Sequence, residues 1–495
     1  MQRARRIPRT RAIHTLVYAA ILNFYQTPQL LLGNIPTDSD NQGERLLASP
    51  RGEFRSRLGF ILAAAGSAVG LGNIWGFPTQ AASNGGAAFL ITYLLMAFVL
   101  AYPALMAELL IGRHTHRNMS SALGSLPSNP KLKALGKLTG LGGLLTASMI
   151  LSFYGIVAGW MLGFTFSYPL DAIGLNSASE WLTSFAVPRN LALMIVFMAL
   201  TMAVVLGGVE DGIERWSRRL MPLLIATLIA LAIYVLTLEG ALTGLSVYLL
   251  PDFDKILSGD LLIDALGSAF FSLSLGVGTM LIYGSYLSDT ESVPGVGAQV
   301  ALLDVGIAVL AGFLILPAMY VADARGVAIF NEAGGLLSED TLIFTVLPAL
   351  FDTMDSAGIW LATAFFALMS IAALTSSISM LEVPVAYLIE RHHLTRRRAT
   401  LIAGAAIASL SALIVLNFGA LFGWVITIST RYSQPLLGIL ICIFAGWLWQ
   451  RDTLLKELKK NDATAEHRLF WRVWPAYVKW LCPVIIGVIL LQSVV

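Results

Sequence analysis

Long apolar runs recur along most of this chain, each bounded by charged residues or by clusters of proline and glycine. A run of about 20 apolar residues is long enough to cross the hydrocarbon core of a bilayer as a helix. We therefore predict eleven spans, at 58–80, 87–111, 138–168, 189–207, 218–238, 263–287, 297–321, 357–389, 399–416, 420–449 and 474–494. The pattern predicts an all-α polytopic membrane protein.

The first of these runs is irregular at its centre, where a spanning helix is normally most regular. Between Gly66 and Gly76 it contains several glycines, a serine and an asparagine. Non-helical backbone at this depth occurs only where it lines a cavity and where other groups take up the freed carbonyls. Cations and a small anionic or zwitterionic ligand are the natural partners. We therefore predict that this span is discontinuous and carries a binding site.

The sixth run shows the same anomaly near its centre, at Ser272, Ser274, Gly276 and Gly278. Two interrupted spans, one opening each five-span half, are typical of a secondary transporter built as an inverted repeat, with its site at the bilayer midplane. We accordingly divide the chain into a first repeat of spans 1–5 (53–240), a second repeat of spans 6–10 (241–450), a cytoplasmic loop (451–473) and a separate eleventh span (474–495).

Composition and charge agree with this organisation. Hydrophobic residues make up 57% of the chain and charged residues 13%, with a mean hydropathy of +0.75. Arginine and lysine gather in 113–137, 390–398 and 451–479, whereas acids dominate 239–264 and 323–355. The positive-inside rule then places the N-terminus in the cytoplasm and the C-terminus outside the inner (cytoplasmic) membrane. The net charge of +2 does not indicate nucleic-acid binding.

Three features outside the spans complete the organisation. Residues 1–52 contain a poor spanning segment, and we interpret them as a cytoplasmic tail that is disordered or belongs to a mis-assigned start. Cys442 and Cys482 lie within apolar runs, so we expect neither a disulfide framework nor a metal cluster. We expect the histidines of the basic loops to be solvated, without a metal-binding role: His114, His116, His392 and His393.

Five motifs carry a resemblance to a known family: SAVGLGNIWGFP (67–78), NGGAAF (84–89), GIERWSRRLMP (212–222), FFSLSLGVG (270–278) and LTSSIS (374–379). Over residues 51–450 the chain resembles the neurotransmitter:sodium symporter family, in particular its bacterial amino-acid transporters and their eleven-span subset. The resemblance implies the leucine-transporter fold, a 5+5 inverted repeat with discontinuous first and sixth spans plus an eleventh span. It also implies sodium-coupled symport.

The resemblance further implies two sodium sites, of which one or both would be used. The first would take oxygens from Ala68, Asn73 and Ser272 and from the substrate carboxylate. The residue that would bind this sodium from the seventh span is left open, because Leu303 stands where the leucine transporter has an asparagine and Asp304 follows it. The second site would consist of Gly66, Val69, Ala372, Thr375 and Ser376.

Asp304 is the one acid deep in the seventh predicted span, and intramembrane carboxylates are usually functional. Family members that need chloride lack a carboxylate near the first sodium site. Asp304, together with Tyr93, Ser268 and Ser272, would therefore replace chloride or bind sodium directly, and we expect no chloride requirement. The alternative, a carboxylate that merely faces an aqueous vestibule, stays open.

For the organic substrate, the resemblance places a carboxylate near the amides of Leu71 and Gly72 and the hydroxyl of Tyr154. Amine-selective members carry an aspartate at the position of Gly70, which offers no counter-ion, so an α-amino acid is expected. The expected binding residues are Ala68, Val69, Gly70, Leu71, Gly72, Ile150, Tyr154, Phe271, Ser272, Ser274, Val277, Ser377 and Met380. Because this lining is mostly apolar, a neutral and hydrophobic amino acid fits best.

The gates differ in how well they match the family. The inner gate is complete in the resemblance, with a cation, an aromatic plug, a bridging tyrosine and an acid at Arg51, Phe54, Tyr286 and Glu390. The outer gate is incomplete, because Gly76 replaces the usual arginine. The position of the usual acidic partner is also occupied by an uncharged residue, Ile426 or a neighbour. Outward closure would then depend on Tyr154 and Phe271, or on Arg431.

Two other classes of function were weighed. An intramembrane enzyme would need a metalloprotease motif, a nucleophile–base pairing or paired spanning aspartates, and the sequence shows none of these, so we predict that the chain is not an enzyme. A non-transporting amino-acid sensor or receptor on the same scaffold stays open, since the outer ion pair is missing. The expected partners are a small-molecule amino acid and the lipid bilayer, without nucleic acid, and the expected assembly is a monomer or weak dimer.

Overall fold

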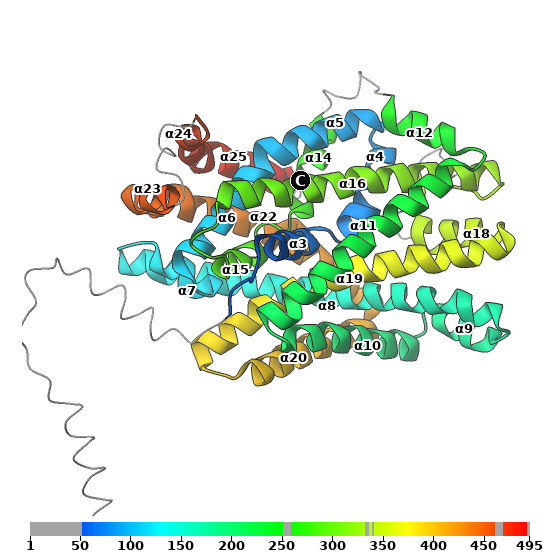
Figure 1. Cartoon of the computed structure of the whole chain (residues 1–495), viewed down its shortest axis with the longest axis horizontal. Coiled ribbons are helices and arrows are strands. Elements are labelled where there is room, and N and C mark those ends of the chain that lie inside the picture. Colours follow the sequence, from blue (N-terminus) through cyan, green and yellow to red (C-terminus); the bar gives the residue numbers. More distant parts are fainter. Residues whose placement is uncertain (1–51, 251–258, 332–335, 339–340, 461–468, 493–495) are drawn as a thin grey trace, which may run out of the picture. The chain divides into compact units, whose positions relative to one another are not determined.

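The computed structural model describes residues 52–250, 259–331, 336–338, 341–460 and 469–492. Residues from 51 onward form one compact unit, shown with its helix labels in Figure 1. The predicted tail and Arg51 lie outside the described residues. No regular strand occurs in the described part, apart from one isolated bridge between Phe330 and Leu336.

Helices coincide with every predicted span. In chain order they are α3 (Arg57–Ala68) with η1 (Gly72–Gly76) and α4 (Phe77–Ser83), α5 (Ala87–Met96) with η2 (Ala97–Ala101) and α6 (Tyr102–Thr115), α8 (Pro130–Ala172), α10 (Val187–Leu206), η3 (Val209–Glu214) with α11 (Arg215–Leu236), α14 (Gly259–Ser272) with α15 (Thr279–Ser285), α16 (Val293–Ala324), α19 (Asp355–His392), α20 (Arg396–Leu416), α21 (Phe418–Ile426) with η5 (Thr427–Ser433), α22 (Gln434–Ile443) and η6 (Phe444–Leu448), and α24 (Leu469–Ala476) with η8 (Tyr477–Leu481) and α25 (Cys482–Gln492). Among the described residues, eight helices are long and apolar enough to cross a membrane, and the bent first pair makes a ninth.

Short helices that the apolar pattern did not predict lie between the spans. They are α7 (Met119–Ser125), α9 (Asn176–Thr183), α12 (Ala241–Leu249), η4 (Leu342–Val346) with α18 (Leu347–Asp352), and α23 (Arg451–Lys459).

The first span is broken, as predicted. Helix α3 begins after Ser56, whose Oγ accepts a hydrogen bond from the Gly59 amide at 3.0 Å and so caps the helix. It ends at Ala68 because Val69 is extended, with φ −68° and ψ 109°. The helical stretch that resumes at Gly72 is bent by 60° from α3. The break is narrower than the glycine-rich stretch suggested, since only Val69 and Gly70 leave the helix.

The sixth span is interrupted between Ser272 and Thr279. Ser274, Gly276 and Gly278 all have positive φ there, at 51°, 85° and 83°. This region of backbone conformation favours glycine, so the two glycines explain why the break lies here. The freed Gly276 amide donates to Oε1 of the buried Glu108 at 2.7 Å, which satisfies one of the donors that the missing helix leaves.

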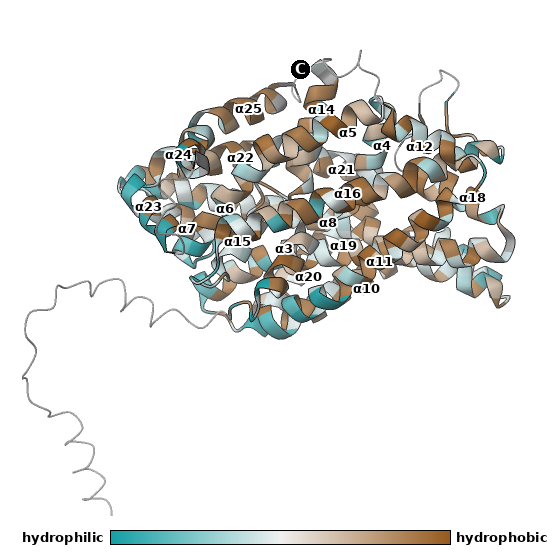
Figure 2. Ribbon diagram, turned by 45° about the horizontal axis from the view of Figure 1, so that its top comes forward, coloured by the Kyte–Doolittle hydropathy of each residue, from teal (hydrophilic) through white to brown (hydrophobic). Residues whose placement is uncertain are grey.

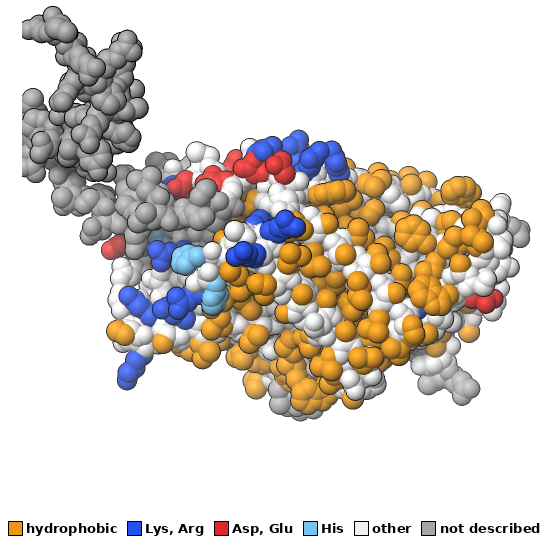
Figure 3. All heavy atoms as spheres, turned by 90° about the horizontal axis from the view of Figure 1, so that it is seen from below, with side chains coloured by type: hydrophobic (Ala, Val, Ile, Leu, Met, Phe, Trp, Pro, Cys, Tyr) orange, Lys and Arg blue, Asp and Glu red, His pale blue; other side chains and the backbone are white. Residues whose placement is uncertain are grey.

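The broken helices lie inside the bundle, where α3 contacts α11, α16 and α19, and α14 contacts α5 (Figure 1). Figure 2 shows hydrophilic residues gathered near α7 and α23, whereas hydrophobic residues predominate along α5 and α25. In the face drawn in Figure 3, apolar side chains cover a broad area and the lysines and arginines gather near one end. An apolar surface of this kind suits contact with lipid, and the helices inside it carry the site.

Candidate functional site

The five residues predicted to bind a second sodium ion come together where the break in the first span meets α19. The Ser376 hydroxyl donates to the carbonyl of Val69 at 2.9 Å and to that of Gly66 at 3.3 Å. The Thr375 hydroxyl donates to the Ala372 carbonyl at 3.0 Å. Both hydroxyl residues are buried. The group supplies only uncharged oxygens, which are suitable ligands for a hard alkali cation.

Two of the residues predicted for a first sodium ion, Asn73 and Ser272, form a second buried group with Asp304. Asn73 joins it through its amide nitrogen, because its Oδ1 accepts from the Gly70 amide at 3.2 Å. The Asn73 side-chain amide donates to Ser272 Oγ and to Asp304 Oδ1, both at 2.7 Å, and Ser272 Oγ donates to Asp304 Oδ2 at 2.7 Å. The Tyr93 hydroxyl donates to Ser272 Oγ at 3.2 Å, whereas no hydrogen bond joins Ser268 to this group in the described part. Asp304 therefore contacts two predicted ligands directly.

The surroundings of Asp304 favour a bound cation. Its side chain is fully buried, and no lysine, arginine or histidine among the described residues forms an ion pair with it. A buried carboxylate without a positive partner is costly, and a cation held by the same oxygens would remove that cost. Leu303, at the position that the resemblance left open, offers no side-chain oxygen.

The expected carboxylate subsite lies at the same break. The Leu71 amide donates to the Tyr154 hydroxyl at 3.1 Å. A Cβ atom placed on Gly70 would lie 2.8 Å from Ser376 Oγ and 2.8 Å from the Tyr154 hydroxyl. An aspartate at position 70 has no room without movement of these groups, so the site cannot take the amine-selective form as it stands.

The remaining predicted lining is mostly apolar. The Phe271 ring lies against Gly72, since a Cβ there would come within 3.1 Å of it. Ser274 Oγ donates to the Ser67 carbonyl at 3.1 Å and so ties the two broken spans together. Further buried lining residues are Ile150, Ser377 and Met380 on the neighbouring helices and Val277 within the break of the sixth span. Among these, Ser377 Oγ is a buried hydroxyl without a hydrogen-bond partner in the described part.

A plug of packed side chains forms around Phe54, the aromatic residue of the predicted inner gate. Its amide donates to the Tyr286 carbonyl at 3.2 Å, and its ring packs edge-on against Phe60 and Tyr283 at centroid distances of 5.3 and 5.7 Å. The structure therefore brings Phe54 and Tyr286 together, as predicted. Glu390 makes a different contact, in which its Oε2 accepts a hydrogen bond from the Asn118 amide at 2.7 Å.

The acid that the Tyr286 hydroxyl contacts is Glu382, at 2.6 Å, and not Glu390. Glu382 is fully buried and forms an ion pair with Arg396 at 2.5 Å. The apolar pattern and the motifs of the sequence did not predict this pair. The available signal was an acid well inside a predicted span, followed fourteen residues later by a basic residue.

The segment before α3 is fixed to the 212–222 motif, for which the sequence suggested no role. The Arg55 amide and the Ser56 hydroxyl each donate to the Glu214 carboxylate at 2.7 Å. Arg55 also forms an ion pair with Glu210. These contacts hold the residues directly after Phe54 against η3, which precedes α11.

Among the described residues, no ion pair forms at Gly76 or Arg431, where the resemblance places the outer gate. A Cβ on Gly76 would meet no atom within 4 Å, and Arg431 is exposed and makes no ion pair with a described residue. Aromatic rings gather here instead. Trp160 packs against Phe344, Phe418 and Phe422 at 5.5, 5.9 and 5.9 Å. Trp75, beside Gly76, contacts Phe344 at 5.7 Å.

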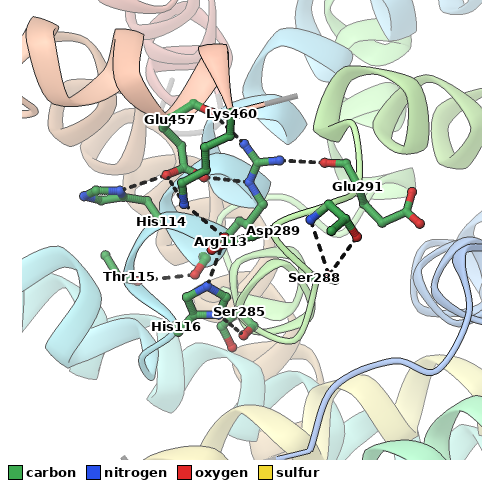
Figure 4. Close-up of polar contacts among 12 residues, drawn as sticks. Arg113, His114, Thr115, His116, Ser285, Ser288, Asp289, Glu291, Glu457 and Lys460 are labelled. Atoms are coloured by element: carbon green, nitrogen blue, oxygen red, sulfur yellow. Dashed lines mark hydrogen bonds and ion pairs between the residues drawn. The ribbon is translucent and has the colours of Figure 1, made fainter. Parts of the chain in front are cut away.

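Two of the four loop histidines contradict the prediction that they are merely solvated. His114 Nδ1 lies 3.1 Å from Glu457, and His116 Nε2 lies 3.5 Å from Asp289 (Figure 4). His114 is held because α23 packs Glu457 against the end of α6, and His116 because the connection between α15 and α16 brings Asp289 beside it. Local charge patterns do not reveal either long-range contact.

Comparisons with known proteins agree with this geometry. The family model described as the sodium:neurotransmitter symporter family matches residues 51–183 and 168–495. An uncharacterized sodium-dependent transporter of Bacillus subtilis is 33% identical over 458 residues, which cover 89% of this chain and 97% of the relative. One from Haemophilus influenzae is 31% identical and covers 90% and 98%. The crystal structure of MhsT in complex with L-phenylalanine has a TM-score of 0.75 and 35% identity, and covers 89% and 99%.

Proposed function

The chain belongs to the sodium:neurotransmitter symporter family, and we propose that it is a symporter that imports a neutral, hydrophobic α-amino acid together with sodium across the cytoplasmic membrane. It is a multi-span membrane transporter of a sodium-dependent family, with the leucine-transporter fold, and not an enzyme. The amino acid, the ion count and the direction of transport are the parts that we propose.

The proposed substrate class is based mainly on the surroundings of Gly70. With a Cβ position only 2.8 Å from two hydroxyl oxygens, this residue offers no side-chain counter-ion for an ammonium group. The substrate must then bring its own carboxylate, which would lie at the Leu71 and Gly72 amides and beside the first sodium ion. The apolar lining favours a neutral, hydrophobic side chain. MhsT, which is similar to this chain, is described in complex with L-phenylalanine.

Two sodium ions fit the oxygen groups. The first would be held by Ala68, Asn73, Ser272 and Asp304, and the second by Gly66, Val69, Ala372, Thr375 and Ser376. The charge of Asp304 would replace chloride. Each ion that enters down a potential of 100 mV yields about 2.3 kcal/mol, and a tenfold concentration gradient adds about 1.4 kcal/mol.

Transport would follow alternating access. Sodium at the second site links the end of α3 to α19, because its ligands come from both helices. Release to the cytoplasm requires that Phe54 separates from Tyr286 and that the segment around Ser56 leaves Glu214. The missing ion pair at Gly76 favours the receptor alternative, since outward closure would depend on aromatic packing alone.

A thermal-shift screen of the purified protein tests the proposal. Each of the twenty amino acids is added in sodium chloride, in potassium chloride and in sodium gluconate. We expect neutral, hydrophobic amino acids to raise the melting temperature in both sodium salts and not in potassium. Stabilisation by amines without a carboxylate, or equal stabilisation in potassium, would contradict the proposed substrate and coupling. A requirement for chloride would contradict the role given to Asp304.

A further inference from the structure

Helix α23 carries a carboxylate that is buried where an exposed one is expected. Glu457 lies in the loop between the tenth and eleventh predicted spans, and only 1% of it is exposed. Burial of a carboxylate is costly unless positive groups and hydrogen bonds compensate for it. The contacts of Glu457 therefore indicate what this loop helix does.

Glu457 is surrounded by basic side chains (Figure 4). Its Oε1 forms an ion pair with Arg113 Nε at 2.7 Å, and its main-chain carbonyl accepts from Arg113 Nη2 at 2.9 Å. Its Oε2 lies 3.1 Å from His114 Nδ1 and 2.9 Å from Lys460 Nζ. Arg113 is itself 2% exposed. The end of α6 is thus joined to α23 by a bidentate contact with little access to water.

The same basic groups reach a third element, the connection between α15 and α16. Arg113 Nη1 donates to the Glu291 carbonyl at 2.7 Å. Lys460 Nζ lies 3.0 Å from Asp289 Oδ1, and His116 Nε2 lies 3.5 Å from the same oxygen. We call the six ionisable side chains concerned the cytoplasmic cluster: Arg113, His114, His116, Asp289, Glu457 and Lys460.

The cytoplasmic cluster is adjacent to the plug. His116 Nδ1 contacts the Ser285 carbonyl at 3.0 Å, and the next carbonyl, of Tyr286, accepts from the Phe54 amide at 3.2 Å. Helices α6 and α15 also pack through glycine, since a Cβ on Gly112 would lie 2.0 Å from the Leu281 carbonyl. The cluster therefore holds the end of α15 from which the plug is fastened.

We infer that Glu457 is a positioning residue that fastens the end of α6 and the α15–α16 connection to α23, so that these elements move together when the cytoplasmic side opens. The inference relies on the proposed function for its transport readout. When Glu457 is neutralised, the end of α15 is no longer held by α23, and the contact between Tyr286 and Phe54 weakens. The cytoplasmic side then opens in the absence of substrate.

The test is hydrogen–deuterium exchange on the full-length protein in nanodiscs, with and without sodium, for Glu457→Gln. The matched control is Asp452→Asn, an exposed acid on the same helix. We expect exchange about tenfold faster at 109–116, 283–291 and 52–60 in Glu457→Gln alone. Glu457→Asp should restore most of the wild-type protection, because it retains the charge.

Since Glu457→Gln leaves Arg113 buried without its partner, Lys460→Gln serves as a second variant. Lys460 is 30% exposed, so its loss breaks the link to Asp289 without burying a charge. The same segments should exchange faster, by a smaller factor. Faster exchange confined to 451–459 in both variants, with protection at 52–60 unchanged, would overturn the inference. Sodium-driven uptake is measured in parallel, and its absence in the wild type would count against the proposed function and not against this coupling.

Discussion

Gly70 lies so close to two hydroxyl groups that a larger side chain at this position requires them to move. The ideal Cβ position is 2.8 Å from both Ser376 Oγ and the Tyr154 hydroxyl, which belong to the second sodium group and to the carboxylate subsite. The small size of Gly70 therefore allows the Ser376 and Tyr154 hydroxyls to lie close to the backbone at this position. At Gly76, by contrast, the same addition meets no atom within 4 Å.

This contrast gives a matched pair of substitutions. Gly70→Ala should weaken binding of amino acid and sodium together by about tenfold or more, because overpacking at a fixed site costs about 1–3 kcal/mol. Gly76→Ala should bind as the wild type does. Isothermal titration in sodium and in potassium measures both, and equal effects of the two substitutions would contradict the close approach at Gly70.

The hydroxyls of α19 give a second residue-scale prediction. Ser376→Ala should remove the part of the sodium-dependent stabilisation that the second site provides, since the Ser376 hydroxyl contacts both the Val69 and Gly66 carbonyls. Thr363→Ala is the control, because Thr363 lies on the same helix and its hydroxyl bonds only to the Ile359 carbonyl. The measurement is the melting temperature against sodium concentration, and an unchanged sodium response in Ser376→Ala would remove the second site.

Glu457 predicts a dependence of stability on pH. Burial alone would raise the pKa of this carboxyl, but the hydrogen bond to His114, the charge of Arg113 and the contact with Lys460 outweigh it and lower the pKa from 4.5 to about 2. A lowered pKa in the folded state stabilises the protein above about pH 4.5, and this stabilisation is lost as the pH falls toward 2. Melting temperatures between pH 6 and the lowest tolerated pH should fall less steeply in Glu457→Gln. Parallel curves for the two proteins would contradict the ion pairs.

At the scale of elements, the break in the sixth span depends on glycine. Gly276 has φ 85°, and a Cβ there would lie 2.4 Å from the Gln434 carbonyl, whereas Gly267 on the same span meets nothing within 4 Å. Gly276→Ala should therefore lower both the melting temperature and substrate binding, while Gly267→Ala should raise or preserve stability. Thermal unfolding with and without substrate distinguishes them, and similar behaviour of the two would show that the break does not need its glycine.

The elements also show what a sequence can predict. The spans and both breaks are local properties, encoded by runs of apolar residues and by clustered glycine, so their positions were predicted within a few residues. The Glu382–Arg396 pair and the cytoplasmic cluster were missed because they depend on packing. Arg113 and Glu457, for example, are 344 positions apart, and nothing local marks them as partners. For the same reason α23 was predicted only as a loop.

At the scale of the whole molecule, the two breaks and α19 supply oxygens to one region, while Phe54 and its neighbours form the plug. The exposed fraction of Phe271 is 38%, whereas that of Phe54 is 8%. The plug residue is therefore more deeply buried than the ring of the predicted substrate lining. Close to Gly76, Trp75 packs against Phe344, which also contacts Trp160.

The central claim is that backbone and side-chain oxygens at the two breaks hold sodium beside an amino acid that is carried across the membrane. Its most direct test is uptake of a labelled neutral amino acid, identified by the thermal-shift screen, into proteoliposomes with an inward sodium gradient. The account predicts accumulation above the external concentration, lost when potassium replaces sodium and lost in Ser376→Ala. Sodium-dependent binding without uptake or exchange of the label would contradict it and favour a receptor.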